Sequence, residues 1–236
     1  MPEPFNNKLL KKFDSEVIGR LQLRKVKFEV WHEVEFPGNS IDNLFFIESG
    51  IGSMTTTFDD GSQVEVGMFG CESVMGASAL MGTRRSLNRV YMQAAGHGYT
   101  TSVERATAEF KRYGQFHDLV LRYVQAQLTQ AVQSAGCNAK HPIGQRLARW
   151  LLLCADRIGS TDMHLSHDFL ADMLGATRSS VALAAQQLKE QGLIDYRRAH
   201  ISIPDVQALE QKACECYRIV KDHLDNYTEF ETGVGA

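Results

Sequence analysis

The stretch that decides the fold is residues 165–181, LSHDFLADMLGATRSSV. Ser166 is a natural N-cap, and the apolar residues after it, Phe169, Leu170 and Met173, recur at helical spacing. Gly175 permits a tight turn, and the residues beyond it have the pattern of a second helix. Two short helices joined by a glycine turn form a helix-turn-helix, so the sequence predicts this motif here.

The second helix is predicted to have one buried and one exposed face, followed by a wing. Its apolar positions are Val181, Ala184, Ala185 and Leu188. Residues 193–203, LIDYRRAHISI, predict two short strands around a basic turn. In a winged helix-turn-helix the leading end of the second helix enters the major groove and the wing contacts phosphates. The candidate DNA-binding residues are Thr177, Arg178, Ser179, Ser180, Leu183, Arg197, Arg198 and His200.

The distribution of charge favours nucleic acid as the partner of this region. The whole chain has a net charge of -3, but residues 140–203 carry eight Lys and Arg against six Asp and Glu. Similar domains exist that bind only protein, and the positions of Arg178 and of the Arg197-Arg198 pair argue against that alternative. Salt dependence distinguishes the two, because counterions compete strongly with DNA binding.

Residues 1–108 have the pattern of an antiparallel β fold. Strand-like stretches such as residues 43–47 and 53–58 alternate with turn signals, and Asp60-Gly61 is a strong hairpin signal. Many short strands without intervening amphipathic helices predict a β-barrel of the jelly-roll, or double-stranded β-helix, type. The predicted fold class is therefore α+β.

Residues 109–138 predict one long helix. Apolar or small residues recur there at steps of three and four, which is the spacing of a coiled-coil seam. The alternative is an amphipathic helix that packs on its own domain. Gly136-Cys137-Asn138 is expected to end the helix, because Gly and Asn tolerate left-handed backbone. The seam predicts a homodimer interface made by Leu121, Val124, Leu128, Ala131 and Ala135.

The rest of the chain and its composition give further expectations. Residues 139–226 predict a mostly helical domain in which Pro142 begins a helix and Gly159-Ser160 ends it. The polar and acidic residues 227–236 predict a flexible tail. The five cysteines have no disulfide-like spacing, and no segment reads as a signal peptide or membrane span, so we expect a cytoplasmic protein.

Three stretches together resemble the Crp/Fnr family of transcription regulators: residues 145–151, QRLARWL, residues 165–181, and Gly192-Leu193-Ile194. Residues 46–50, FIESG, and Asp59-Asp60-Gly61 resemble the family's strand-turn and following hairpin. The resemblance implies a homodimer that binds a near-palindromic DNA site, responds to a small-molecule effector and contacts RNA polymerase. It also implies the domain order, namely a cyclic-nucleotide-binding-like sensor barrel at 1–108, a dimerisation helix at 109–138 and a winged helix-turn-helix at 139–226.

The resemblance locates an effector pocket, and the chain departs from the family there. Cyclic-nucleotide binders hold the ribose with Gly-Glu and the phosphate with Arg-Ser or Arg-Thr, and the corresponding residues here are Gly76-Ala77 and Arg85-Ser86. Losing the carboxylate removes a charged hydrogen bond of roughly 1.5–3 kcal/mol, so cyclic AMP is not the expected effector. A cyclic-nucleotide-responsive regulator that uses Arg85-Ser86 is the alternative.

The recognition helix also departs from the family. Its reading positions commonly carry Arg, Glu and Arg, and these fall on Arg178, on Ser180 or Ser179, and on Leu183. Only the first is retained. The resemblance therefore implies an operator different from that of the best-known members, read with fewer hydrogen bonds to bases.

Other cofactors and an enzymatic function are not expected. Family members with iron-sulfur clusters carry N-terminal cysteines, and this chain has none before Cys71. Haem would need axial ligands from His97, Cys71 or the Pro2 terminus, and a lone His on a strand is generally structural. Cys214 and Cys216 are expected on one helix, where residues two apart face different directions, so no metal site is predicted.

The sequence carries no Gly-rich phosphate loop, H-E-x-x-H motif or nucleophile elbow, so no enzymatic activity is predicted. The remaining alternative from another functional class is a ligand- or protein-binding module with a degenerate helix-turn-helix. Steep salt dependence of DNA binding would argue against it.

Overall fold

The computed structural model describes residues 5–82 and 84–229. The chain divides into two compact units, which we describe separately. Unit 1 consists of the residues up to 52, residues 69–129 and the residues from 222 onward. Unit 2 consists of residues 53–68 and 130–221. Among the described residues, no helix has the length and apolar character needed to cross a bilayer.

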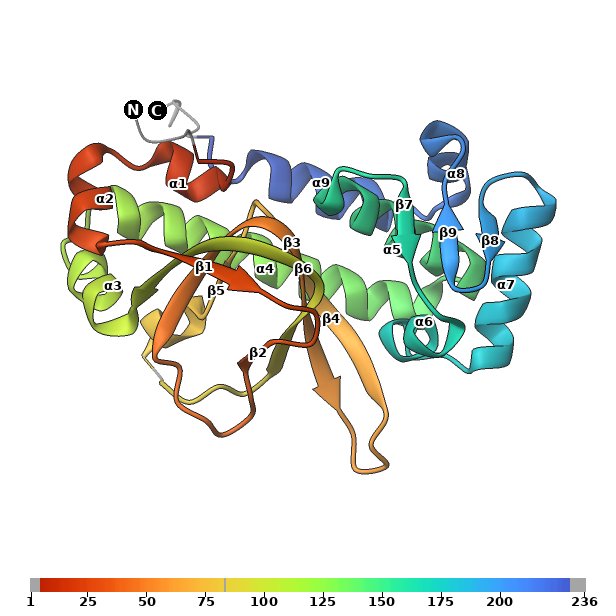
Figure 1. The fold of residues 1–236 in the computed structure, drawn as a ribbon, viewed down its shortest axis with the longest axis horizontal. Coiled ribbons are helices and arrows are strands. Elements are labelled where there is room, and N and C mark those ends of the chain that lie inside the picture. The colour runs from red at the N-terminus through yellow and green to blue at the C-terminus, as the bar shows by residue number, and fades with distance from the viewer. Residues whose placement is uncertain (1–4, 83, 230–236) are drawn as a thin grey trace, which may run out of the picture. The chain divides into compact units, whose positions relative to one another are not determined.

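Unit 1 contains an antiparallel β fold with short helices before and after it (Figure 1). Strand β6 pairs with β1, β2 and β3, and β5 pairs with β3, which confirms the predicted antiparallel β fold. Within the described chain the strand order β1-β6-β3-β4 is not closed by hydrogen bonds. The elements are α1 (Lys8–Lys12), α2 (Ser15–Leu21), β1 (Arg24–Phe28), β2 (Glu33–Glu35), β3 (Asn43–Thr57), β5 (Val74–Met75), the 3-10 helix η1 (Ala77–Met81), β6 (Arg89–Ser102), α3 (Val103–Phe110) and the first half of α4 (Gln115–Lys140).

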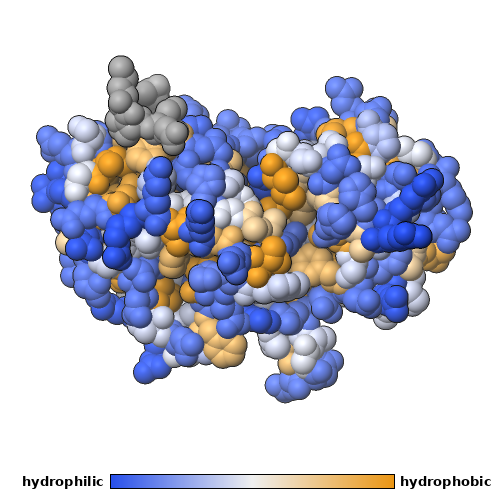
Figure 2. All heavy atoms as spheres, viewed as in Figure 1, coloured by the Kyte–Doolittle hydropathy of each residue, from blue (hydrophilic) through white to orange (hydrophobic). Residues whose placement is uncertain are grey.

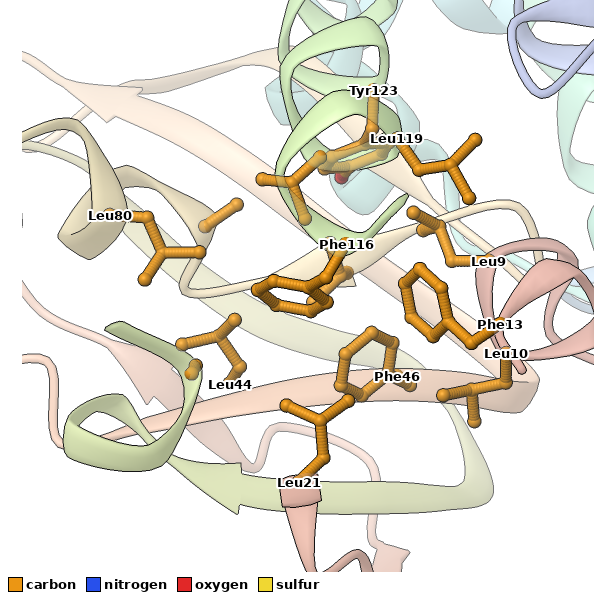
Figure 3. Close-up of a cluster of buried hydrophobic side chains, with 14 of the residues drawn as sticks. Leu9, Leu10, Phe13, Leu21, Leu44, Phe46, Leu80, Phe116, Leu119 and Tyr123 are labelled. Atoms are coloured by element: carbon orange, nitrogen blue, oxygen red, sulfur yellow. The ribbon is translucent and has the colours of Figure 1, made fainter. Parts of the chain in front are cut away.

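The core of unit 1 joins the N-terminal helices, the sheet and the start of α4 (Figure 3). Leu9, Phe46 and Leu119 come from α1, β3 and α4, and none of them is exposed. Phe13 packs its ring against that of Phe116, with centroids 5.4 Å apart. The two N-terminal helices are thus part of the core, because they cover apolar side chains of β3 and α4.

The first residues of the predicted flexible tail are packed, which corrects that expectation for residues 227–229. The ring of Tyr227 lies 5.8 Å from that of Tyr123, and its hydroxyl donates to the backbone oxygen of Glu72. Lys12 forms an ion pair with Glu229 at 3.1 Å. An aromatic residue that buries its ring against a helix does not fray, in spite of its polar neighbours. Residues 230–236 of the predicted tail lie outside the described residues.

Unit 2 contains a β-hairpin, the second half of α4 and a set of helices with a small sheet (Figure 1). Helix α5 packs against α6, α7 and α8, and the short strands pair in the order β7-β9-β8. The elements are the end of β3, β4 (Gln63–Phe69), α5 (Ile143–Ile158), β7 (Asp162–His164), α6 (His167–Leu174), α7 (Arg178–Glu190), β8 (Asp195–Arg197), β9 (His200–Ser202), α8 (Val206–Lys212) and most of α9 (Cys216–Asn226).

The predicted long helix differs from the observed one at both ends. It is interrupted after α3, because Tyr113 takes left-handed backbone with φ 55°, and α4 starts only at Gln115. At its other end α4 continues past the expected stop to Lys140. Gly136 does not adopt a left-handed cap, and the next residue, Cys137, is buried with Cys214 and Cys216 within unit 2.

A buried carboxylate ties the hairpin of unit 2 to α5. Glu65 on β4 accepts hydrogen bonds from Trp150 Nε1 at 2.8 Å and from Ser53 Oγ at 2.7 Å. Burial raises the pKa of Glu65 to about 7, although these two bonds and the charges of Arg157 and Arg149 act in the opposite direction. The folded protein therefore prefers the neutral carboxyl over a pH range where an unfolded chain is already ionised.

This preference makes the stability of unit 2 depend on pH. The contribution of Glu65 is fully present below its ordinary pKa of 4.5 and is lost as the pH rises through about 7. The free energy of unfolding of the wild type, relative to that of a Glu65→Gln variant, should therefore decrease as the pH rises from about 4.5 to about 7. Urea unfolding followed by Trp150 fluorescence in a Trp31→Phe background measures it, with Glu190→Gln at an exposed position as the control. A difference that is constant with pH would contradict the assignment.

Candidate nucleic-acid interface

The first helix of the predicted motif begins and ends as its sequence predicts. Ser166 Oγ accepts from Phe169 N at 3.1 Å, which caps α6. Gly175 ends the helix in left-handed backbone with φ 54°, and its N–H donates to the oxygens of Ala171 and Asp172. The turn between the helices therefore depends on a residue without a side chain.

The second helix, α7, also begins at its predicted cap. Thr177 Oγ1 accepts from Ser180 N at 3.2 Å and lies 2.8 Å and 3.1 Å from the hydroxyls of Ser180 and Ser179. The predicted inner face is confirmed as buried. Its residues are Val181, Ala184, Ala185 and Leu188, each 2% exposed or less.

The opposite face of α7 is exposed at its leading end. The side chain of Arg178 is 69% exposed, and its Nε lies 3.2 Å from Asp168 Oδ1 on α6. Leu183 is 58% exposed one turn further on, which is unusual for a large apolar side chain of a packed helix. This leading end thus presents one cation, several hydroxyls and one apolar group to solvent.

The predicted wing is confirmed as a tight two-residue hairpin. Strands β8 and β9 are joined by Arg198 and Ala199, both left-handed with φ 47° and 64°. This is the backbone of the turn type that suits a two-residue hairpin, although neither residue is glycine. Arg197 is exposed at the end of β8, and His200 Nε2 lies 3.5 Å from Asp162 Oδ1. In Figure 2 strongly hydrophilic residues gather over β8 and α7.

Two features that hold the wing were missed by the sequence analysis. The first is β7, which pairs with β9 and makes the wing three-stranded. The second is a pair of contacts with the neighbouring helices: the ring of Tyr196 stacks on that of His167 at 4.4 Å, and Lys189 Nζ lies 2.9 Å from Asp195 Oδ1. The hydrogen bond from Lys189 lowers the pKa of Asp195. Short strands such as β7 carry too few residues for a periodic signal.

The residues that the resemblance places in the effector pocket lie together in unit 1, around a carboxylate. Glu35 Oε1 accepts from the backbone N–H of Gly76 at 3.0 Å, and Glu35 Oε2 accepts from Ser86 Oγ at 2.7 Å. Burial raises the pKa of Glu35, while these two bonds act in the opposite direction. Ala77 is buried, and the exposed Arg85 donates from Nη1 to Gly38 O at 2.7 Å. Two of the predicted pocket donors are thus already used by Glu35, which sequence analysis missed.

The predicted dimer seam on α4 is exposed at some positions and half-buried at others. Leu121 and Leu128 are 41% and 63% exposed, and Ala135 is also exposed. Val124 packs against the core of unit 1, and Ala131 is half-buried. Val132, which the sequence analysis did not single out, is 63% exposed.

Comparisons with known proteins agree with this geometry. Residues 145–212 match the family model of the Crp-like helix-turn-helix domain. The "Global nitrogen regulator" of Synechococcus elongatus is 24% identical over 216 residues, which cover 87% of this chain and 97% of the relative. The protein of the same description from Nostoc is 25% identical over 187 residues, which cover 75% of this chain and 83% of the relative.

Solved structures share the fold. A transcriptional regulator of the Crp/Fnr family from Eubacterium rectale has a TM-score of 0.70 at 16% identity, covering 87% of this chain and 97% of that structure. FixK2 from Bradyrhizobium japonicum has a TM-score of 0.70 at 16% identity, with coverage of 81% and 98%. At such low identity these matches show the fold alone.

A capped helix, a glycine turn, a second helix with an exposed leading end and a three-stranded wing define a winged helix-turn-helix, a fold that many DNA-binding regulators share. Together with the match to the Crp-like domain model and the fold of its neighbours, this defines the type more closely. The chain is a transcriptional regulator with a Crp-like helix-turn-helix domain, and its fold is similar to that of Crp/Fnr regulators.

The turn at Gly175 gives a prediction about stability. A Cβ there would lie 2.7 Å from Val64 Cγ2, and the left-handed backbone itself costs other residues about 1–2 kcal/mol. Gly175→Ala should therefore lower the free energy of unfolding of unit 2 by at least about 1 kcal/mol. Gly144→Ala in α5, where a Cβ meets no atom within 4 Å, is the matched control and should be neutral or stabilising. Equal stabilities of the two variants in urea unfolding would contradict the account of the turn.

Proposed function

We propose that this regulator binds a near-palindromic DNA site as a homodimer, with the leading end of α7 in the major groove. The observation that carries the proposal is the division of α7 into a buried inner face and an exposed leading end with Arg178 and Leu183. An arginine at this position suits a guanine, whose O6 and N7 accept two hydrogen bonds, and an exposed apolar side chain suits a thymine methyl group. Thr177, Ser179 and Ser180 would add hydroxyl contacts.

The wing would contribute contacts that carry no sequence information. Arg197, Arg198 and His200 lie in or next to a two-residue turn, where long basic side chains reach outward. Contacts with phosphates position a protein on the duplex, while contacts with base edges select the sequence. This division of roles predicts that losing a wing arginine weakens binding to all sequences alike.

Dimerisation would proceed through α4. Leu121, Leu128, Val132 and Ala135 recur along it at steps of seven, four and three, which is the spacing of a helix-helix seam, and all four are exposed. Val124 and Ala131 are the weaker candidates of the predicted interface, because they are half-buried within the chain. Two copies would bring two α7 helices to half-sites about one helical turn, or roughly 34 Å, apart.

The effector would not be cyclic AMP. In the predicted pocket Ala77 supplies no acceptor for a ribose hydroxyl, and Glu35 already uses the donors of Gly76 and Ser86. A phosphate entering there would meet a carboxylate, which repels it unless the carboxylate is neutral or moves away. A cyclic-nucleotide response through Arg85 and Ser86, the alternative from the sequence, would therefore require Glu35 to be displaced.

We further propose a cytoplasmic location and RNA polymerase as a partner.

Replacing Arg178 tests the proposal directly. Arg178→Ala should reduce discrimination between a site selected from random DNA and a shuffled site by about 1–3 kcal/mol, which is roughly fivefold to 160-fold, because one bidentate base contact is lost. Competition gel-shift measures this ratio, with Arg24→Ala on β1 as the control. If Arg178→Ala and the control discriminate as well as the wild type, α7 does not read the sequence.

Replacing apolar residues on α4 tests the dimer. The double variant Leu128→Lys, Val132→Lys should sediment as a monomer at concentrations where the wild type is a dimer, because like charges would face each other across the seam. Leu87→Lys, at a position that is 81% exposed and lies outside α4, is the control and should remain dimeric. A wild type that sediments as a monomer, or a double variant that remains dimeric, would exclude this interface.

A further inference from the structure

Four side chains with metal-binding chemistry converge within unit 2. Cys137, His141, Cys214 and Cys216 each offer one ligand atom, and these four atoms all lie within 4.8 Å of one another. The three cysteines are no more than 5% exposed and pack together as a separate buried cluster. None of them takes part in the proposed contacts with DNA, so the cluster requires its own explanation.

The backbone explains why these residues meet. Cys137 and His141 lie four residues apart, and His141 N donates to Cys137 O at 3.0 Å, so the two side chains share one face at the end of α4. Cys214 lies in the break between α8 and α9, and Cys216 begins α9. The expectation that Cys214 and Cys216 share one helix is therefore wrong. The break lets both thiols turn to the same side, which a continuous helix would prevent.

The spacing suits one metal ion. Cys137 Sγ lies 3.5 Å from Cys214 Sγ, and Cys216 Sγ lies 3.5 Å from His141 Nδ1. A tetrahedral zinc ion, with bonds of about 2.3 Å to sulfur and about 2.0 Å to nitrogen, holds its ligand atoms about 3.6–3.8 Å apart. The remaining pairs of ligand atoms lie no more than 4.8 Å apart, so they would have to approach by about 1 Å at most to reach this separation. An iron-sulfur cluster, which contains several metal atoms, needs more widely spaced ligands.

The surroundings of the cluster also have the form of a metal site. Glu215 Oε1 lies 3.3 Å from Nε2 of His141, which leaves Nδ1 directed at the thiols. A carboxylate on the far nitrogen of a histidine is the usual second contact of a metal-bound imidazole. Gln133 Nε2 donates to Cys216 Sγ at 3.0 Å, which is a second polar contact that orients a ligand atom.

The charge of such a site would be compensated from α5. Three thiolates and one divalent ion leave one negative charge in a buried place, which is unfavourable without a partner. The buried Arg149 and the partly buried Arg146 both interact electrostatically with Cys137. These two guanidinium groups place positive charge near the cluster, so a centre with three thiolates would have compensating neighbours.

We propose that Cys137, His141, Cys214 and Cys216 bind one zinc-class divalent ion in a tetrahedral site with three sulfurs and one nitrogen. Thiolates select soft and borderline metals, and four protein ligands leave no open position, so the site is structural rather than catalytic. Its two ligand pairs lie on either side of residues 142–213, which contain the winged helix-turn-helix. The ion would thus join the beginning of this region to its end.

Cobalt provides a spectroscopic test. Metal-free full-length protein, reduced and titrated with Co²⁺, should bind one equivalent with thiolate-to-cobalt charge transfer and the strong visible bands of tetrahedral coordination, and Zn²⁺ should displace it. Protein purified without chelator should carry one equivalent of zinc by mass spectrometry of the metal. Its midpoint of thermal unfolding should fall when the metal is removed, because binding is linked to folding.

Matched variants locate the ligands. Cys137→Ser and Cys216→Ser should each lose the charge-transfer band or weaken cobalt binding at least tenfold, whereas Cys71→Ser, outside the cluster, should bind like the wild type. His141→Cys should keep a tetrahedral spectrum, since four thiolates also bind zinc, while His141→Ala should weaken binding. The conservative His141→Cys variant guards against a loss caused only by misfolding.

Four results would overturn the proposal. They are wild-type protein that binds no cobalt with thiolate bands, equal binding by the cluster variants and the wild type, the absorption of an iron-sulfur cluster in the protein as isolated, and a Cys137–Cys214 disulfide in protein kept under reducing conditions. DNA binding is not a readout in any of these measurements. The metal site and the proposed DNA contacts can therefore fail independently.

Discussion

Four buried side chains on the inner face of α7 fix the orientation of this helix, and thereby determine which of its residues are exposed to solvent. These buried side chains are Val181, Ala184, Ala185 and Leu188. Helix α7 packs against α5. Ala184 and Ala185, in the middle of this buried face, have small side chains that suit close packing between helices. Because residues on one helix face are set by the 3.6-residue period, burial of this face leaves Arg178 and Leu183 exposed. The wing follows, since Lys189 at the end of the same helix holds Asp195.

The hairpin at residues 53–68 belongs to the same compact unit as the helix-turn-helix. Val64 lies where a side chain on Gly175 would be, and Glu65 accepts a hydrogen bond from Trp150 on α5. A segment that the sequence assigns to the N-terminal β fold therefore contacts both the turn of the motif and the helix that supports α7. The shape of the recognition surface depends on these contacts as well as on local sequence.

Local chemistry made much of the DNA-binding domain predictable. Caps at Ser166 and Thr177 and the turn at Gly175 each depend on one residue and its neighbours, so the sequence analysis located them correctly. What it missed depends on distant residues. Glu35 accepts a hydrogen bond from Ser86 of the predicted effector pocket, although the two residues lie 51 positions apart in the sequence. Cys137 contacts Cys214, which lies 77 positions further along the chain. No periodic pattern in the sequence predicts such contacts. The interruption at Tyr113 and the packing of Tyr227 have the same origin.

The central claim is that the leading end of α7 and the wing form one DNA-binding surface. Amide hydrogen exchange of the full-length protein, with and without a duplex selected from random DNA, tests it most directly. The account predicts that exchange slows in residues 177–183 and 195–200 on binding, and much less in α1 and α2. Unchanged exchange in both segments while the protein is saturated with DNA would contradict it.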